Sequence, residues 1–231
     1  MKQGKSAGQA CVCVFAKAPQ PGVVKTRLLA VLSPKQACTV HEGLVSSCLA
    51  AIDSPDWQTQ LWSTDPENNF IRQCRQAQRL SHHLQWGSNL GERMANAVHE
   101  NLQRHEQVII VGTDCPQIDH EMINTAINHL RSGKDIVLAP ADDGGYVLIG
   151  FSTQVGAGVL EVFNNIDWGT EFVLEQTRAR IRSSGLDSFE LVTCRDIDRP
   201  PDLYWLADAY PELFHSIGVS VALPQSDHEP G

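Results

Sequence analysis

Basic side chains gather in one short segment of a chain that is acidic as a whole. Lys17, Lys25 and Arg27 lie within eleven residues. The apolar run before them, at 10–16, is typical of a strand buried on both faces of a parallel sheet. Ligands of open α/β sheets bind beyond the carboxyl ends of strands. The segment is therefore a candidate anion-binding loop, with a solvated surface loop as the alternative.

Carboxylates follow three further predicted strands. They are Asp114 after a strand at 107–112, Asp142 and Asp143 after one at 135–140, and Asp196 and Asp198 after one at 189–193. A carboxylate about 4 Å from a phosphate oxygen would be repelled by on the order of 4 kcal/mol at an effective dielectric constant of about 20. Asp114 can therefore approach a polyphosphate only through a bridging cation. Mg²⁺ or Mn²⁺ suits these oxygen ligands, and Lys25 and Arg27 would neutralise the remaining phosphate charge.

Each acidic residue also has a structural interpretation. Asp114 could cap the next helix, and the segment 142–145 (DDGG) suits a hairpin turn. Asp196 could be a turn residue and Asp202 a helix cap. The nine histidines are dispersed at no ligand spacing, so no catalytic histidine is predicted.

Alternating strands and helices must position these loops. We expect strands at 10–16, 58–63, 82–85, 107–112, 135–140, 146–150 and 189–193, and helices at 34–52, 67–78, 91–105, 119–131, 171–184 and 203–209. Thr170 should cap the helix at 171–184, and Gly185 should end it. The five residues between the strands at 135–140 and 146–150 favour a hairpin. The prediction is a three-layer α/β/α fold with a mixed, mainly parallel sheet.

Composition limits the class of protein. The 231 residues are 42% hydrophobic and 19% charged, which suits one domain over 1–231, with 1–8 and 225–231 expected to be disordered. The net charge of −9 disfavours a nucleic-acid partner. Seven scattered cysteines without a CxxC pair predict reduced thiols, and the run at 10–16 is too short for a membrane span or signal peptide, so a cytoplasmic location is expected. Trp57, Trp62 and Trp205 are candidates for an exposed surface that would support a homodimer.

Six blocks in a fixed order resemble a known family. They are FAKAP at 15–19 with PG at 21–22 and KTRL at 25–28, NLGERM at 89–94, GTDCP at 112–116, DDGGY at 142–146, WGT at 168–170, and DID at 196–198 with Asp202. Together they cover about residues 10–210 and resemble bacterial GT-A-like glycosyltransferases, also labelled radical-SAM/selenodomain-associated transferases of type 1. That family is similar in fold to the nucleotide-diphospho-sugar transferases and small nucleotidylyltransferases.

The resemblance implies three groups of site residues. Lys17, Pro21, Gly22, Lys25, Arg27, Leu90, Gly91 and Arg93 would bind the nucleotide. Asp142, Asp143, Gly144, Gly145, Tyr146, Trp168 and Thr170 would face the sugar or acceptor. Asp114 would ligate the metal, with Asp198 or the pair Asp142 and Asp143 completing its site. Position 116 is proline, so a strict Asp-x-Asp motif is missing, and the first loop is not glycine-rich.

Three functions remain open at this point. The first is a metal-dependent glycosyltransferase that moves a sugar from a nucleotide diphosphate donor to a small-molecule or lipid-linked acceptor, with Asp143 as general base and Lys25 and Arg27 stabilising the departing diphosphate. The second is a nucleotidylyltransferase acting on a phosphorylated small molecule. The third is a nucleotide-binding protein without turnover, because the missing second aspartate would leave the metal under-coordinated.

Overall fold

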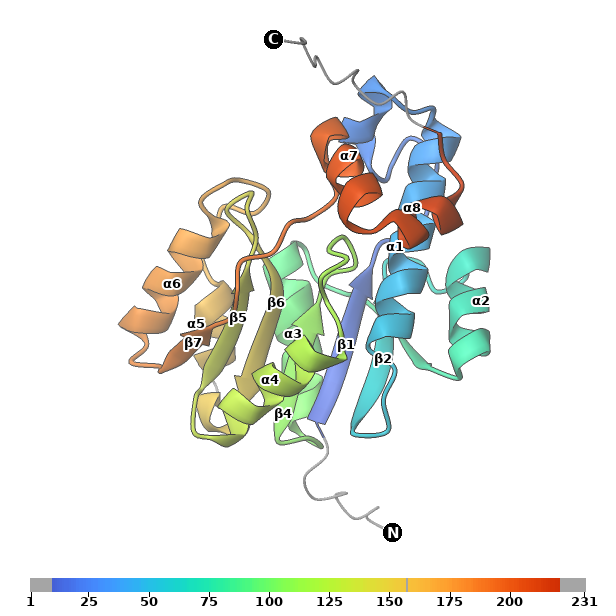
Figure 1. Cartoon of the computed structure of the whole chain (residues 1–231). Coiled ribbons are helices and arrows are strands. Elements are labelled where there is room, and N and C mark those ends of the chain that lie inside the picture. The colour runs from blue at the N-terminus through green and yellow to red at the C-terminus, as the bar shows by residue number, and fades with distance from the viewer. Residues whose placement is uncertain (1–9, 157, 221–231) are drawn as a thin grey trace.

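The computed structural model describes residues 10–156 and 158–220, so the predicted disorder at 1–8 and 225–231 lies outside the described residues. Seven strands form one sheet in the order β3-β2-β1-β4-β6-β5-β7 (Figure 1). They are β1 (Ala10–Ala16), β2 (Trp57–Ser63), β3 (Ser81–Leu84), β4 (Gln107–Val111), β5 (Ile136–Pro140), β6 (Tyr146–Ser152) and β7 (Ser188–Glu190). The predicted fold class, three layers around a mixed and mainly parallel sheet, is confirmed.

Only β6 runs against its neighbours in this sheet. It pairs antiparallel with both β4 and β5, whereas the β1–β2, β1–β4, β2–β3 and β5–β7 pairs are parallel. The hairpin predicted between β5 and β6 is therefore present. The carboxyl ends of β1, β4 and β5 consequently lie on the same side of the sheet, where the strands end, together with the amino end of β6.

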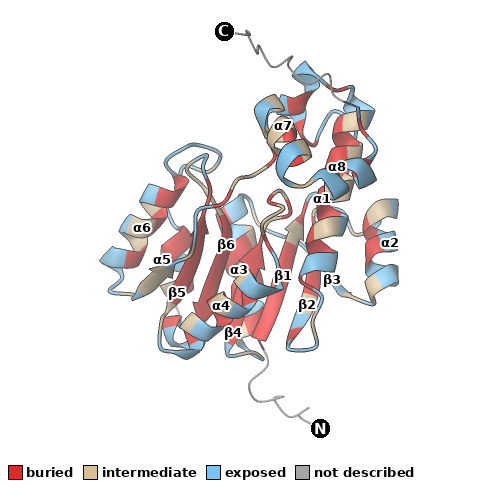
Figure 2. Ribbon diagram, viewed as in Figure 1, coloured by how far each residue is buried: buried red, intermediate tan, exposed pale blue. Residues whose placement is uncertain are grey.

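Helices cover both faces of the sheet, and buried strand residues form the layer between them (Figure 2). One apolar cluster joins the sheet to α1 (Pro34–Ala51), α2 (Asn69–Gln78) and α4 (His120–Arg131). The other joins it to α3 (Leu90–Leu102), α5 (Gly158–Phe163) and α6 (Val173–Ser183). Successive residues of β1 alternate between the two clusters, which explains why its whole sequence is apolar.

A third apolar cluster lies beyond the carboxyl ends of the strands. It joins the 3-10 helix η1 (Thr26–Ala30), the first half of α1, α7 (Pro200–Ala209) and α8 (Pro211–Ile217). Figure 1 shows α7 and α8 beside the upper part of α1. This cluster fixes the basic loop after β1 and the acidic segment before α7 against each other. Neither α5, α8 nor the short helices η1 and η2 (Thr153–Val155) was predicted from the sequence.

The observed ends of helices and strands agree with the predicted residues at some positions and differ at others. Ser33 and Gln36 form a capping box at the start of α1, which begins at the predicted residue. The prediction that Thr170 caps α6 is wrong, because that helix begins after Phe172, and the Thr170 hydroxyl instead donates to Asp167 O. The last strand ends at Glu190, three residues earlier than predicted.

Two of the three tryptophans considered for a surface role, and all seven cysteines, are buried. Trp57 and Trp62 are in the core, so the prediction of a dimer surface on them is wrong. All seven cysteines are buried and free, as expected for reduced thiols, and Cys11 and Cys13 share one face of β1. Among the described helices, none has the length and apolar character that crossing a membrane requires.

Candidate functional site

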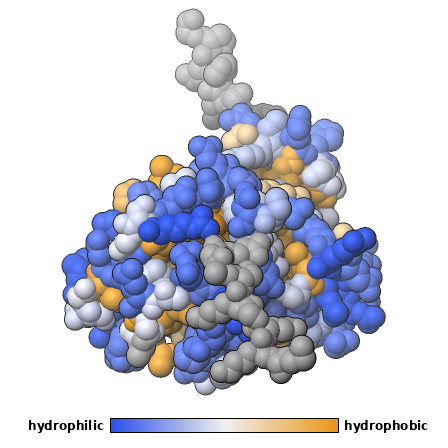
Figure 3. All heavy atoms as spheres, turned by 90° about the horizontal axis from the view of Figure 1, so that it is seen from below, coloured by the Kyte–Doolittle hydropathy of each residue, from blue (hydrophilic) through white to orange (hydrophobic). Residues whose placement is uncertain are grey.

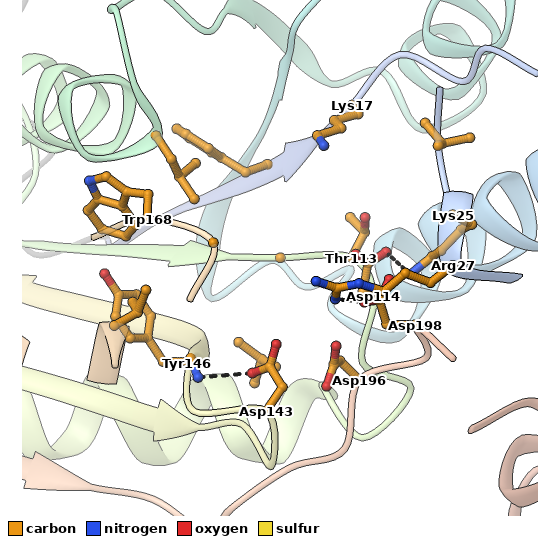
Figure 4. Close-up of a pocket in the computed structure, with 18 of the residues that line it drawn as sticks. Lys17, Lys25, Arg27, Thr113, Asp114, Asp143, Tyr146, Trp168, Asp196 and Asp198 are labelled. Carbon is orange, nitrogen blue, oxygen red and sulfur yellow. Dashed lines mark hydrogen bonds and ion pairs between the residues drawn. The ribbon is translucent and has the colours of Figure 1, made fainter. Parts of the chain in front are cut away.

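A cavity of about 1300 Å³ opens at the carboxyl ends of β1 and β4 and beside the hairpin that joins β5 and β6 (Figure 4). It is lined by thirteen of the predicted site residues: Lys17, Lys25, Arg27, Leu90, Arg93, Asp114, Asp142, Asp143, Gly145, Tyr146, Trp168, Thr170 and Asp198. Four predicted site residues, Pro21, Gly22, Gly91 and Gly144, do not line it. The cavity therefore brings together predicted residues from six separate segments of the chain.

Lys25 and Asp114 form a contact at the centre of this cavity. Lys25 Nζ lies 2.7 Å from Asp114 Oδ1 and donates a hydrogen bond of 2.5 Å to Ile197 O. Its side chain is 3% exposed, whereas that of Asp114 is 48% exposed. Burial raises the pKa of Asp114, but Lys25 and His41 outweigh that effect and hold this pKa well below its usual range. Asp114 is therefore an ionised group with one buried oxygen and an open side facing the cavity.

Arg27 and Asp198 form a second ion pair beside the first. The hydrogen bond to Asp198, followed by its charge, raises the pKa of Arg27. A backbone hydrogen bond of 2.8 Å from Ile197 N to Asp114 O joins the two pairs, so the loops after β4 and before α7 are held together. The two cations predicted to neutralise phosphate thus already contact the two carboxylates predicted to hold metal.

His41 reaches this centre from helix α1, although it was not among the predicted site residues. Its Nε2 lies 2.9 Å from Lys17 O, and its Nδ1 lies 3.8 Å from Asp114 Oδ1. The ring thereby joins the start of the basic loop to the carboxylate after β4. One signal could have revealed it, since His41 interrupts the buried stripe that Ala37, Val40 and Leu44 form on this helix.

Two carboxylates lie at the side of the cavity formed by the hairpin and the segment before α7. Asp143 Oδ1 accepts a hydrogen bond of 2.9 Å from Gly145 N, so this residue shapes the turn and also lines the cavity. Asp196 faces it in Figure 4. Burial and the neighbouring Asp143 carboxylate raise the pKa of Asp196 to about 6. The sequence placed Asp196 at a strand end but did not separate it from an ordinary turn residue.

Three other cations line the cavity without an ion pair. Lys17, Arg93 and Arg199 belong to none of the salt bridges found among residues 10–156 and 158–220. Arg93 Nε donates to Gly87 O at 3.2 Å, which anchors one side of its guanidinium. These side chains, rather than Lys25 and Arg27, are the cations available to an incoming anion.

Gly91 and Gly144 do not line the cavity, but close packing at these two positions determines where Trp168 and its loop lie. A Cβ on Gly91 would lie 2.6 Å from the Trp168 ring, so the start of α3 packs directly against the indole. Gly144, at φ +87°, would place a Cβ 2.1 Å from Glu171 O. The hairpin and the loop bearing Trp168 can therefore approach only because position 144 lacks a side chain.

Asp114 and Asp198 offer the oxygen ligands that a divalent cation prefers. No group of three or more His, Cys, Asp or Glu side chains converges on one point within the described ranges. Mg²⁺ is commonly held by one or two carboxylates together with phosphate oxygens and water. The open side of Asp114 fits that pattern, so these residues suit an ion that arrives with a phosphate ligand.

A scan against protein-family models gives one match over residues 48–170, to DUF2064, which is described as an uncharacterized protein conserved in bacteria. The chain belongs to this family. The matched region of this DUF2064 protein runs from the end of α1 to the loop after Trp168, so it includes Arg93, Asp114 and the hairpin aspartates. No curated protein matches the chain.

Solved structures confirm the fold of this DUF2064 protein. A protein from Desulfovibrio desulfuricans G20 with the provisional name nucleotide-diphospho-sugar transferase is 24% identical, with a TM-score of 0.77 over 92% of this chain and 100% of that one. CMP:2-keto-3-deoxy-manno-octonic acid synthetase complexed with CTP is 12% identical, with a TM-score of 0.56 over 89% and 99%. The manganese complex of Rv0371c from Mycobacterium tuberculosis H37Rv is 16% identical, with a TM-score of 0.50 over 91% and 100%.

Proposed function

We propose that this DUF2064 protein is a transferase that binds a nucleotide diphosphate sugar in the described cavity and moves the sugar to an acceptor hydroxyl. The observation that carries this proposal is the charge arrangement of the cavity. The unpaired cations Lys17 and Arg93 occupy the side near β1 and α3, two ion pairs occupy the centre, and carboxylates with aromatic rings occupy the side near the hairpin. A diphosphate at the centre would place its two ends in these two different environments.

The nucleotide would bind on the side of the unpaired cations. Lys17 and Arg93 can approach phosphate oxygens without first breaking an ion pair. Gln85 lies near them, and its side-chain Nε2 donates to Trp62 O at 2.9 Å and to Ala16 O at 3.3 Å. Because both carbonyls need a donor, the amide orientation is fixed, and Gln85 Oε1 remains as an acceptor for a base or ribose.

The centre would hold the diphosphate and a divalent cation. Asp114 and Asp198 would hold Mg²⁺ or Mn²⁺, which would neutralise negative charge on the departing diphosphate. The manganese complex of a structural neighbour supports this choice of ion. Lys25 keeps Asp114 ionised and in place, since its buried ammonium contacts both Asp114 and Ile197 O. Arg27 orients Asp198 in the same way.

Asp143 would accept the proton of the acceptor hydroxyl. Its Oδ1 is held by Gly145 N, which leaves Oδ2 for the cavity and fixes the direction in which that oxygen points. If Asp143 has this role, Asp143→Asn should lower turnover about a hundredfold or more with little change in nucleotide affinity. Full turnover in this variant would remove Asp143 from the mechanism.

Nucleotidyl transfer is the second candidate, and the structural neighbour complexed with CTP favours it. A nucleoside triphosphate carries more negative charge than a diphosphate and needs more cations. Here Lys25 and Arg27 are already neutralised by carboxylates, so the loop after β1 offers only Lys17 as an unpaired cation among its described residues. That charge balance supports the diphosphate sugar over the triphosphate.

The two reactions release different products, so one assay separates them. The protein should be incubated with Mg²⁺ or Mn²⁺ and either a panel of nucleotide sugars or a panel of nucleoside triphosphates with sugar phosphates. Glycosyl transfer predicts release of a nucleoside diphosphate from the first panel. Release of pyrophosphate from the second panel would instead establish nucleotidyl transfer and overturn the proposal.

A further inference from the structure

The end of the cavity near the hairpin has an excess of negative charge. Asp142, Asp143 and Glu171 line this end, and none of them belongs to a salt bridge found in the described part of the chain. Asp196 also lines this end. An anionic group entering here would approach several carboxylates, and each of them would repel it.

Most cations at this end are already neutralised. Arg27 contacts Asp198, and Arg195 Nη2 lies 2.9 Å from Asp202 Oδ1. The Arg195 guanidinium also lies over the Trp205 ring, 5.4 Å from its centroid, which is a second contact that holds this side chain in place. Arg199 remains as one unpaired cation, which is fewer than the unpaired carboxylates, so the net charge at this end is negative.

Aromatic side chains form the wall beside these carboxylates. Trp168, Tyr146 and Phe172 all line the cavity, and Phe172 is half exposed. Trp168 is held in place, because Gly91 packs against one side of its indole and the Phe163 ring lies 6.3 Å away. Figure 4 shows Trp168 and Tyr146 together at this end, across from Lys17.

This combination matches one type of ligand. Aromatic faces pack against the C–H face of a sugar ring, and carboxylates accept hydrogen bonds from its hydroxyl groups. We propose that the acceptor is an uncharged carbohydrate-like molecule, and that this end of the cavity excludes acceptors that carry a phosphate or carboxylate. The inference rests on the proposed glycosyl transfer and narrows it, since sugar phosphates and phosphorylated lipid carriers would be rejected as acceptors.

The test uses two probes that differ in one phosphate. Glucose and glucose 6-phosphate are added separately to the full-length protein with Mg²⁺ and a nucleoside diphosphate, and binding is measured by saturation-transfer difference NMR. We expect a signal for glucose and a signal at least about tenfold weaker for glucose 6-phosphate, because several like charges oppose the phosphate. An equal or stronger signal for glucose 6-phosphate, or no signal for glucose, would overturn the proposal.

Variants test whether charge at this end causes the discrimination. The double variant Asp142→Asn/Glu171→Gln removes two unpaired carboxylates and should reduce the discrimination to about threefold or less. Asp208→Asn is the matched control, because Asp208 is exposed on α7 and does not line the cavity. Melting curves confirm that each variant is folded. Unchanged discrimination in a folded double variant would contradict the charge argument.

Failure of this inference is distinguishable from failure of the proposed function. Calorimetric titration with UDP, GDP, ADP and CDP measures nucleotide binding without any acceptor. Nucleotide binding together with preferred binding of glucose 6-phosphate would refute the acceptor class alone. Absence of binding for all four nucleotides would refute the proposed function.

Discussion

Lys25 and Asp114 contact each other, but removing one or the other charge should reduce the stability of the protein by different amounts. Removing the carboxylate with Asp114→Asn leaves a nearly inaccessible ammonium whose described partner is Ile197 O. Removing the ammonium with Lys25→Met leaves a carboxylate that water can reach, because the Asp114 side chain is 48% exposed. Asp114→Asn should therefore destabilise the protein more than Lys25→Met does.

The magnitude follows from the geometry and the exposure. Two unit charges 2.7 Å apart attract by about 6 kcal/mol at an effective dielectric constant of 20. Water on the open side of Asp114 screens much of that attraction, so the cost lies between about 1 kcal/mol for an exposed pair and about 4 kcal/mol for a buried one. We expect a loss of about 2 kcal/mol for Asp114→Asn, or about 4 to 8 °C in melting temperature for a chain of this size.

Urea denaturation followed by tryptophan fluorescence measures both variants and the double variant. The double variant should have a free energy of unfolding similar to that of Lys25→Met, because neither protein contains an inaccessible ammonium that has lost its carboxylate partner. The contribution of Asp114 to stability should change with pH in a defined direction. The folded-state pKa of Asp114 is depressed, so its contribution is present above the unfolded-state pKa of about 4 and is lost as pH falls toward the folded value. A larger loss for Lys25→Met than for Asp114→Asn would refute this reasoning.

Three further predictions concern other parts of the structure. Arg93→Ala should weaken nucleoside diphosphate binding about tenfold in calorimetry, because Arg93 is an unpaired cation of the cavity, and should cost only about 1 kcal/mol of stability through the lost hydrogen bond to Gly87 O. Gly144→Ala should lower the free energy of unfolding by about 3 kcal/mol, since its Cβ would meet Glu171 O at 2.1 Å. Glu190→Gln should cost less than about 1 kcal/mol at pH 7, because the hydrogen bonds from Arg178 lower the pKa of a carboxyl that is about one third exposed. This last difference should shrink as pH falls below the unfolded-state pKa of about 4.3 and vanish below the lower folded-state pKa, where both states bind the proton.

The Arg93 and Gly144 variants each have a matched control. Arg104→Ala removes an exposed arginine that does not line the cavity, and nucleotide affinity should not change. Gly133→Ala has a similar φ of +103° but no atom within 4 Å of the added Cβ, so it should cost only about 1 kcal/mol. Equal losses for Gly144→Ala and Gly133→Ala would show that backbone strain alone, without the close approach to Glu171, accounts for the effect.

The fold could be predicted because the strand and helix patterns are locally determined. The apolar run of β1, the capping box at Ser33 and the five residues of the hairpin each depend on neighbours in the sequence. Helix α8 was missed because it is stabilised mainly by packing against α7 and α1. The cap of α6 was misplaced because Thr170 donates its hydroxyl hydrogen to Asp167 O within a preceding turn.

Residue type and strand-end position were enough to bring the basic loop and the strand-end aspartates to one cavity, whereas Leu90, Arg93 and Trp168 were included through the family resemblance. They could not show that Lys25 would pair with Asp114, because these residues are far apart in sequence and each had a ligand role that suited its charge. The raised pKa of Asp196 also depends on tertiary structure, since burial and the proximity of Asp143 cause it. Charge pairing across distant loops therefore decides which cations can meet a ligand.

Calorimetric titration of the protein with UDP, GDP, ADP and CDP in the presence of Mg²⁺ tests the central claim most directly. The arrangement of Lys17, Arg93 and Asp114 predicts micromolar binding of at least one of these nucleotides, and weaker binding when EDTA replaces Mg²⁺. It also predicts a selective loss of affinity in Arg93→Ala. Absence of heat for all four nucleotides, or an affinity that does not change with Arg93→Ala, would contradict a nucleotide site in this cavity.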